Sequence, residues 1–202
     1  MDSKEDKEQN LRLADWQIHD ILDKVKMIDP YVGHQVSEVD GRKVVSYGLT
    51  SAGYDIRISD EFKIFSPIPG SGGAAVDPKN FDSRLLHDFK GEVCELPAHS
   101  YALAKSVESF NIPEDIQVTC VGKSTYARCG IYVNVTPLEP GWRGVLTVEI
   151  ANASPSPVKI YANEGIAQLL FDQLKGPARV SYAAKKGKYQ DQTGIVTARM
   201  KE

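Results

Sequence analysis

The chain has 202 residues, of which 42% are hydrophobic and 25% are charged, and its formal net charge is −3. This length suits one domain with an ordinary hydrophobic core, and the composition excludes collagen-like, wholly disordered and low-complexity proteins. There is no run of about 18 apolar residues, so no membrane span is expected. The mild acidity also argues against binding to long nucleic acid, whose affinity depends largely on neutralising phosphates.

The N-terminal residues and the cysteines indicate the compartment. Residues 1–10 contain no apolar residue after Met1, so we expect a flexible, solvated arm and no signal peptide. Cys94, Cys120 and Cys129 lack the even number and regular spacing of a disulfide framework. Reduced thiols are typical of a cytosol-like compartment, so a cytoplasmic protein is expected, with Cys120 and Cys129 as small core residues.

One amphipathic helix is predicted near the start of the chain. Its apolar residues follow the spacing of a single helix face, at Ile18, Ile21, Leu22 and Val25. Asp15 can cap this helix or lie in its first turn. We expect the helix to end before Pro30.

After this helix, apolar residues alternate or form short runs between turn residues. The predicted strands are Tyr54–Ile58, Glu61–Phe65, Val93–Leu96, Tyr101–Lys105, Ile116–Val121, Ile131–Val135, Val145–Ile150, Val158–Tyr161 and Ala167–Gln173. Many short strands at close spacing indicate an antiparallel sandwich or barrel. Ser66–Ala75, rich in Gly and Pro, is predicted to be a surface loop. Without a repeat or a linker, residues 11–180 are expected to form one mainly β domain.

Residues 181–202 differ in composition from the β domain. They combine several basic residues with small and polar ones, and Gly187 and Gly194 add flexible points. One interpretation is a frayed terminus. The other is a flexible basic flap that becomes ordered over a binding site when a polyanion binds, because a local basic cluster attracts anions even in an acidic protein.

Several site motifs are absent. The chain has no G-x-x-x-x-G-K-[ST] phosphate loop and no glycine-rich dinucleotide fingerprint. Its histidines show neither H-E-x-x-H nor the H-x-E with P-C-x-x-C of zinc deaminases. No zinc site is therefore expected.

The segment from Val121 to Ile150 carries more informative residues. Lys123, Ser124 and Arg128 lie close together, and if Ser124 opens a short helix, Ser124 and Arg128 project from one face. The free N–H groups of a helix start, a hydroxyl and two cations suit a phosphate. The alternative is a capped helical turn with solvated cations.

A glutamate interrupts the apolar strand Val-Leu-Thr-Val-Glu-Ile in the same segment. Alternation places Glu149 and Thr147 on the face opposite Leu146, Val148 and Ile150. An unpaired buried carboxylate is costly, and burial raises the pKa of a carboxyl toward the range useful for proton transfer. Glu149 is therefore either a solvent-facing strand residue or an acid–base group in a site.

Five stretches of the chain carry a family resemblance. They are GLTSAGYDIRIS (Gly48–Ser59), GKSTYARCGI (Gly122–Ile131), NVTPLEPGWRG (Asn134–Gly144), VEIANASPSPVKIYANEGIAQLLF (Val148–Phe171) and GKYQDQTG (Gly187–Gly194). In their order and spacing the chain resembles the dCTP deaminases, from about Leu11 to Gly194. The sequence departs from the family at Val148, where Leu is usual, and at Ile150, where an aromatic residue is common.

The resemblance implies a fold, an assembly and a reaction. The fold is a mainly β, dUTPase-like distorted barrel or sandwich with an N-terminal helix and a few short helices, and the assembly is a homotrimer that shares its active sites. The reaction is hydrolysis at the C4 amino group of cytosine, which converts dCTP to dUTP with release of ammonia and supplies dUMP and dTTP. Mg²⁺ is implied on the triphosphate, with no metal ligand from protein side chains and no zinc, and feedback by dTTP is suggested.

The resemblance also implies the site residues. Glu149 would be the catalytic carboxylate, taking a proton from water positioned by Ser124 and by carbonyls near Thr136–Pro137, with Arg128 also in catalysis. The residues implied to contact the nucleotide are Lys123, Ser124, Thr125, Tyr126, Ala127, Arg128, Glu139, Thr147, Val148, Glu149, Gln168, Tyr182, Lys188 and Gln192.

Three alternatives stay open. A dUTPase typically carries a GFGSTG-like motif in its C-terminal arm, where this chain has GKYQDQTG. A bifunctional dCTP deaminase/dUTPase, which yields dUMP and pyrophosphate, tends to have Thr-Ala-Gly where this chain has Thr136-Pro137-Leu138. A non-catalytic nucleotide-binding module would bind nucleotide and release no ammonia.

Overall fold

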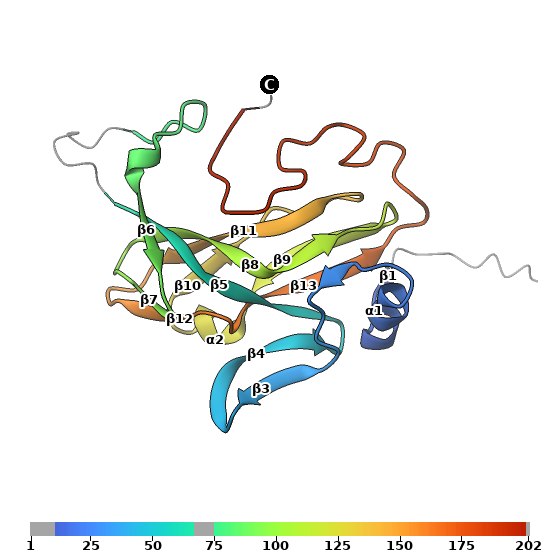
Figure 1. The fold of residues 1–202 in the computed structure, drawn as a ribbon, viewed down its shortest axis with the longest axis horizontal. Coiled ribbons are helices and arrows are strands. Elements are labelled where there is room, and N and C mark those ends of the chain that lie inside the picture. The colour runs from blue at the N-terminus through green and yellow to red at the C-terminus, as the bar shows by residue number, and fades with distance from the viewer. Residues whose placement is uncertain (1–10, 67–74, 201–202) are drawn as a thin grey trace, which may run out of the picture.

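The computed structural model describes residues 11–66 and 75–200, in which strands predominate (Figure 1). The helices are α1 (Asp15–Leu22), the short α2 (Ser124–Ala127) and a 3₁₀ turn, η1 (Ser83–Leu85). The strands are β1 (Leu11–Arg12), β2 (Ile28–Asp29), β3 (Gln35–Val39), β4 (Arg42–Thr50), β5 (Gly53–Phe65), β6 (Leu86–Lys90), β7 (Val93–Leu96), β8 (Tyr101–Asn111), β9 (Ile116–Gly122), β10 (Ile131–Asn134), β11 (Arg143–Asn152), β12 (Val158–Tyr161) and β13 (Gly165–Gln173). The predicted mainly β fold is confirmed.

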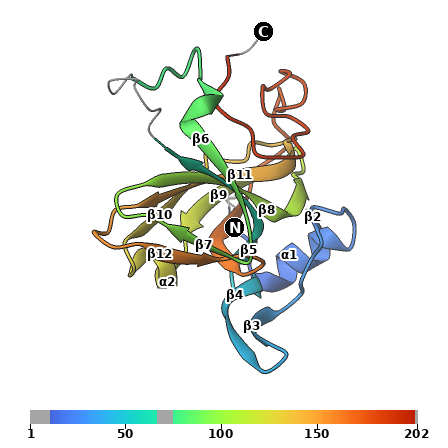
Figure 2. The same ribbon diagram turned by 60° about the vertical axis from the view of Figure 1, so that its left-hand side comes forward.

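Most of these strands belong to one curled sheet. Within the described residues it has 11 strands, and its longest path runs β1-β13-β5-β8-β11-β10. Strands β2, β3, β4, β6 and β9 branch from this path, and β12 pairs with β7 in a separate two-stranded sheet. Every pairing between two of these strands is antiparallel. Figure 2 shows how the sheet curls on itself, as the barrel-like prediction requires.

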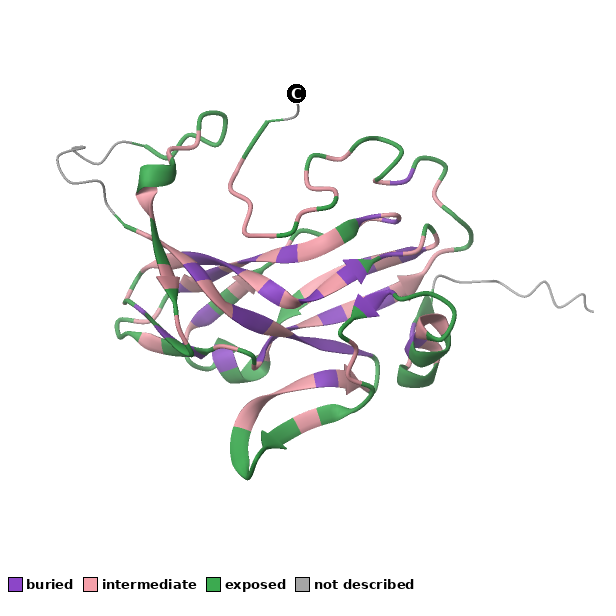
Figure 3. Ribbon diagram, in the orientation of Figure 1, coloured by how far each residue is buried: buried purple, intermediate pink, exposed green. Residues whose placement is uncertain are grey.

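The core follows from the alternation of side chains along the central strands. Along β11, Leu146, Val148 and Ile150 are buried, while the residues between them are partly exposed. Figure 3 shows the same alternation of buried and intermediate residues along the neighbouring strands. One face of β11 is therefore committed to the core, as predicted, and the other face is available to a site.

Helix α1 is shorter than predicted. It ends at Leu22, and Val25 lies beyond its end with an exposed fraction of 39%. The chain closes the helix with a tight turn, in which the N–H groups of Lys24 and Val25 both bond to the carbonyl of Ile21. Asp15 is the first-turn acid that one interpretation predicted.

The β3–β4 hairpin was missed in the sequence. Its turn is Asp40-Gly41, and both residues have positive φ, 49° and 74°. Asp-Gly is a strong sequence signal for the tight hairpin turn that requires this conformation. The signal was overlooked because β3 is largely exposed, most of β4 is only partly buried, and neither strand has a clear apolar stripe.

Two strands that were predicted separately form one continuous strand in the structure. Tyr54–Ile58 and Glu61–Phe65 are parts of β5, whose register against β8 shifts between Ile58 and Phe62. The intervening polar residues that suggested a turn therefore occupy an irregularity within a continuous strand. Strand β6 was not predicted, and β8 extends beyond its predicted end at Lys105.

The three cysteines differ in their exposure to solvent. Cys94 is buried, Cys120 is partly buried and Cys129 is exposed, so the prediction that Cys129 is a core residue is wrong. Cys129 follows α2 at a turn completed by Gly130, whose φ is 81°. Burial raises the pKa of Cys94 to about 11 and that of Cys120 to about 12.

Some predictions fall outside the described residues: the arm at 1–10, most of the Ser66–Ala75 loop, and the last two residues of the C-terminal segment. No helix in the described ranges is both long and apolar enough to cross a membrane.

A substitution at Gly165 tests how closely β13 packs against β4. A Cβ at this position would lie 1.9 Å from the backbone oxygen of Ser46, which cannot move unless β4 moves. We expect Gly165→Ala to lower the free energy of unfolding by about 1–3 kcal/mol, as overpacking does, in urea titrations. Gly176→Ala is the matched control because a Cβ there meets nothing within 4 Å; equal stability of the two variants would contradict the prediction.

Candidate active site

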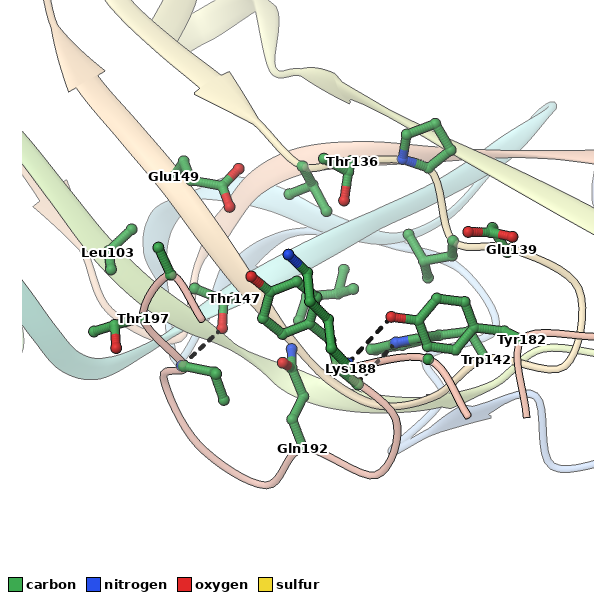
Figure 4. Close-up of a pocket in the computed structure, with 18 of the residues that line it drawn as sticks. Leu103, Thr136, Glu139, Trp142, Thr147, Glu149, Tyr182, Lys188, Gln192 and Thr197 are labelled. Atoms are coloured by element: carbon green, nitrogen blue, oxygen red, sulfur yellow. Dashed lines mark hydrogen bonds between the residues drawn. The ribbon is translucent and has the colours of Figure 1, made fainter. Parts of the chain in front are cut away.

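A cavity of about 1200 Å³ lies between the main sheet and the C-terminal segment, which we define as residues 181–198 (Figure 4). In Figure 1 this segment is part of the red coil above β8 and β11. Residues from β11, from the loop after β10 and from the C-terminal segment meet around the cavity. Those among them that the family resemblance had singled out are Glu139, Thr147, Glu149, Tyr182, Lys188 and Gln192.

Glu149 lies on the face of β11 that the core does not use. Its neighbours Val148 and Ile150 are fully buried, so alternation turns the Glu149 carboxyl toward the cavity. Burial raises its pKa to about 7, and a hydrogen bond from Asn134 opposes this shift. The carboxyl is therefore near half-ionised at neutral pH, where it can both accept and deliver a proton.

Asn134 holds the carboxyl from the neighbouring strand. The two residues are directly paired between β10 and β11, and Asn134 Nδ2 donates to Glu149 Oε2 at 3.0 Å. Sequence reasoning missed this partner. The pairing follows from the register of the two strands, and no motif around Asn134 reveals it.

An aromatic wall closes the cavity near Glu149. Phe65 packs edge-on against Tyr101 and Phe81, with ring centroids 5.2 and 6.0 Å apart, and all three rings line the cavity with Leu103. Burial raises the pKa of Tyr101 to about 12, and the nearby Glu149 carboxyl adds to this shift. These rings and Glu149 therefore line one largely apolar part of the cavity. These apolar residues were also missed as part of a site.

The C-terminal segment is bonded to the edge of β11. The Val145 N–H donates to the Gln192 carbonyl at 2.9 Å, and Gln192 Nε2 donates to the Val145 carbonyl at 2.6 Å. Further along, the Val196 N–H donates to Thr147 Oγ1 at 3.1 Å. Gly144 permits this approach because a Cβ there would lie 2.8 Å from the Gln192 oxygen. In this structure the segment therefore lies against β11.

A predicted turn anchors the start of the same segment. Trp142 N–H bonds to the Glu139 carbonyl at 3.0 Å, with Gly141 at φ 78°, which is a tight turn with Gly at its third position. The Pro140 carbonyl accepts from the Tyr182 N–H at 2.8 Å. The Tyr182 hydroxyl in turn accepts from Tyr189 N–H at 3.1 Å. These bonds place Tyr182 in the cavity wall.

The cations at the cavity come from the C-terminal segment. Lys188 Nζ lies 5.0 Å from the ring centroid of Tyr189 and donates to the Arg199 carbonyl at 3.1 Å. Lys185 forms an ion pair with Glu139. Both lysines line the cavity, so it can attract an anionic ligand.

The remaining predicted site residues form a second group outside this cavity. Ser124 begins α2, as predicted, and Arg128 Nη1 donates to the Ser124 carbonyl at 3.0 Å. Lys123 and Gln168 both bond to Asp55. In both ribbon views α2 lies below the main sheet, whereas the C-terminal segment lies above it (Figures 1 and 2). A single chain therefore does not bring Ser124 and Arg128 to Glu149.

Side chains in the second group differ in exposure. Ser124, Thr125, Ala127 and Arg128 are exposed. Tyr126 is buried, and its hydroxyl accepts a hydrogen bond from the Tyr161 N–H at 3.0 Å. Val148, on β11, is also fully buried. Neither side chain is therefore available to a ligand in this chain.

The described residues contain no group of three histidine, cysteine or carboxylate side chains that could hold a metal ion. What the cavity does offer is a partly desolvated carboxyl, an amide donor to that carboxyl, aromatic and aliphatic walls, and cations at the C-terminal segment. This combination suits proton transfer on an uncharged ring that carries an anionic tail.

The raised pKa of Glu149 predicts a pH-dependent stability. Between pH 4.5 and about 7 the folded protein holds this proton more tightly than the unfolded chain does, so stability is lost as pH rises through that window. Glu149→Gln removes the ionisation. We expect the variant to be more stable than the parent above pH 7, by about 2 kcal/mol after allowance for solvent access, and nearly equal at pH 4.5.

Urea titrations at pH 4.5 and pH 8 measure this difference. The matched control is Glu95→Gln, on the exposed side of β7. A stability difference for Glu149→Gln that is the same at both pH values would contradict a buried, proton-holding carboxyl.

The family match and two of the most similar curated proteins indicate the same family. Residues 12–174 match the dCTP deaminase-like family. A dCTP deaminase of Campylobacter curvus (strain 525.92) is 58% identical over 174 residues, which cover 86% of this chain and 90% of that protein. A dCTP deaminase of Francisella tularensis subsp. novicida (strain U112) is 56% identical over 169 residues, covering 84% and 88%.

The fold comparison agrees. The crystal structure of the 2'-deoxycytidine 5'-triphosphate deaminase from Agrobacterium tumefaciens matches 81% of this chain with a TM-score of 0.57 and 19% sequence identity. The match covers 48% of that protein, so this chain spans about half of its length, and the likeness concerns the fold alone. On the family match and the identity to curated relatives, the chain belongs to the dCTP deaminase-like family.

Proposed function

We propose that this protein is a dCTP deaminase, a hydrolase that converts dCTP to dUTP and ammonia and so supplies dUMP and dTTP synthesis. The observation that carries the proposal is the Glu149 carboxyl, which faces a cavity with its pKa raised to about 7 by burial. Relatives with 56–58% identity are dCTP deaminases, and this is the reaction that the motifs in the sequence also indicate.

Glu149 would move protons in both halves of the reaction. As a carboxylate it accepts a proton from a water molecule whose oxygen attacks C4 of cytosine. It then delivers that proton to N3, where it stays. In the second half Glu149 takes the proton of the new C4 hydroxyl and passes it to the amino group, which leaves as ammonia while C4 becomes the carbonyl of uracil. Thr136 and Pro137 line the same cavity, and their backbone carbonyls are suited to hold the water. Asn134 would fix the orientation of the carboxyl.

The C-terminal segment would bind the phosphates. Lys188 supplies positive charge, while Tyr182 and Gln192 supply hydrogen-bonding groups in the cavity wall. Mg²⁺ bound to the triphosphate would neutralise part of its charge. Because the described residues offer no cluster of metal ligands, the phosphates themselves would hold the ion.

We further propose that the active site is completed in a homotrimer. Ser124 and Arg128 lie outside the cavity that holds Glu149, so they would act in the cavity of a neighbouring subunit. There Ser124 would position the attacking water, and Arg128 would fix Ser124 or stabilise charge on the ring. The exposure of both residues leaves them available for such a contact. Feedback by dTTP and a cytoplasmic location belong to the same proposal.

Glu149→Gln tests the catalytic role. The amide keeps the shape of the side chain but cannot take a proton from water, so we expect kcat for ammonia release from dCTP with Mg²⁺ to fall by at least about 100-fold. Binding of dCTP should persist. Glu95→Gln, which changes an exposed strand glutamate, is the control. Near-normal turnover by Glu149→Gln would refute the assignment, and product chromatography would detect dUMP and pyrophosphate if the enzyme were bifunctional.

Mixed trimers test whether the site is shared. Glu149→Gln and Ser124→Ala subunits should each be inactive alone. When they are refolded together in equal amounts, about one quarter of shared sites combine an intact Glu149 with an intact Ser124. We therefore expect ammonia release to return to about that fraction of the parent activity. If each site belonged to one subunit, every site would keep a lesion and no activity would return.

A further inference from the structure

A second buried carboxylate lies on β5, at Asp55, with an exposed fraction of 2%. Its Oδ2 accepts from Lys123 Nζ and, at 3.1 Å, from Gln35 Nε2. Its Oδ1 accepts from Gln168 Nε2 at 3.2 Å. No residue of the cavity that holds Glu149 takes part in this cluster.

The position of Asp55 lets it connect several elements. In β5 it pairs with Gly48 of β4 on one side and with Gln168 of β13 on the other. Lys123 is the residue that caps the start of α2, and Gln35 comes from β3. A displacement of the Asp55 side chain would therefore reach both β13 and the α2 turn that carries Ser124.

The ion pair accounts for the burial of two charges. The side chains of Asp55 and Lys123 are 3% and 11% exposed, so neither charge is left to water. A carboxylate in such a place needs a cation and further donors, and Asp55 has both. Lys123 is thus directed inward, unlike the solvated lysine of a simple capped turn.

The hydrogen bonds to Asp55 determine which donors and acceptors of Lys123 and Gln168 remain available to a ligand. An ammonium has three donors, and Asp55 occupies one of those on Lys123. The amide nitrogen of Gln168 is used twice, by Asp55 and by Thr50 Oγ1 at 3.1 Å. Because a carboxylate can only accept, it holds the Gln168 amide with its nitrogen inward. The Gln168 oxygen accepts no hydrogen bond from any described residue.

We propose that Asp55 is a positioning residue for nucleotide binding. Through Lys123 it presents a donor for a phosphate oxygen, and through Gln168 it presents an acceptor, which suits a nucleotide hydroxyl or a metal-bound water and not a phosphate oxygen. This inference rests on the proposed function, together with the family resemblance, which implies that Lys123 and Gln168 contact the nucleotide.

Asp55→Asn tests it, because the amide keeps the shape of the side chain and removes the charge. Losing a charged hydrogen-bond partner of Lys123 should raise KM for dCTP by about 10–100-fold, while kcat changes less than about threefold, since Glu149 is untouched and Ser124 keeps its contact with Arg128 within the α2 turn. The double variant with Lys123→Met should have the KM of Lys123→Met alone, because an amide oxygen at position 55 can still accept from Gln168. An unchanged KM in folded Asp55→Asn, or effects that add fully, would overturn the proposal.

The matched control is Glu108→Gln. Glu108 is also a buried strand carboxylate paired with a cation, Arg57 at 2.7 Å, and it contacts none of the residues proposed to bind nucleotide. It should lower stability and leave KM unchanged. If Asp55→Asn does not fold, Gln35→Leu is the second variant, because it removes one hydrogen bond from a neutral donor to Asp55. It should raise KM by about two- to tenfold. An unchanged KM would then count against the proposal.

Binding measurements separate failure of this inference from failure of the proposed function. If the parent protein released no ammonia from dCTP, the proposed function would fail. Calorimetric titration of dCTP with Mg²⁺ into the parent and into Asp55→Asn would still report the affinity change. An active parent enzyme with equal affinity in both proteins would refute the role of Asp55 alone.

Discussion

The site depends on keeping one carboxyl group, that of Glu149, where water only partly reaches it. The alternation of β11 provides this: Val148 and Ile150 fix the strand against the core, and the residue between them must face the other way. A carboxyl in that position is costly when ionised. The amide donor of Asn134 reduces the cost without removing it, so the group stays near half-ionised at neutral pH. Reduced stability is thus tied to the chemistry proposed for this residue.

The main sheet carries a polar segment on each side, the C-terminal segment above and the α2 turn below. The two are attached to the sheet by different interactions. Above the sheet, the C-terminal segment is attached to β11 through backbone groups of Val145 and Gln192, through the side-chain amide of Gln192 and through an exposed ion pair between Arg143 and Asp191. Below it, the α2 turn is attached through a buried ion pair between Lys123 and Asp55. The upper bonds can open without moving a buried charge into water, whereas the buried ion pair cannot. The upper attachment is therefore suited to admit and release a ligand, and the lower one to stay rigid.

Much of the site was readable from single residues in their local pattern. Glu149 was found because a charge in an otherwise apolar alternation needs an explanation, and the Ser124 helix start and the turn at Gly141 follow from short-range rules. Asp55 carries the same signal as Glu149, a charge between apolar strand residues, and it was overlooked.

Other features could not be read from the sequence. Asn134 reaches Glu149 only because β10 and β11 pair in one register. The aromatic wall joins Phe65 to Tyr101 from strands far apart in the chain. The hairpin turn at Asp40-Gly41 was readable and was missed, whereas the length of β5 depends on an irregular pairing that no local rule specifies.

The three thiols offer a practical handle. Burial leaves Cys94 and Cys120 with pKa values of about 11 and 12, so they are almost entirely protonated and unreactive at neutral pH. Cys129 is exposed one residue after Arg128. A maleimide dye added to the unmodified protein should attach there selectively, and its emission would then report on the surroundings of the α2 turn without any engineered cysteine.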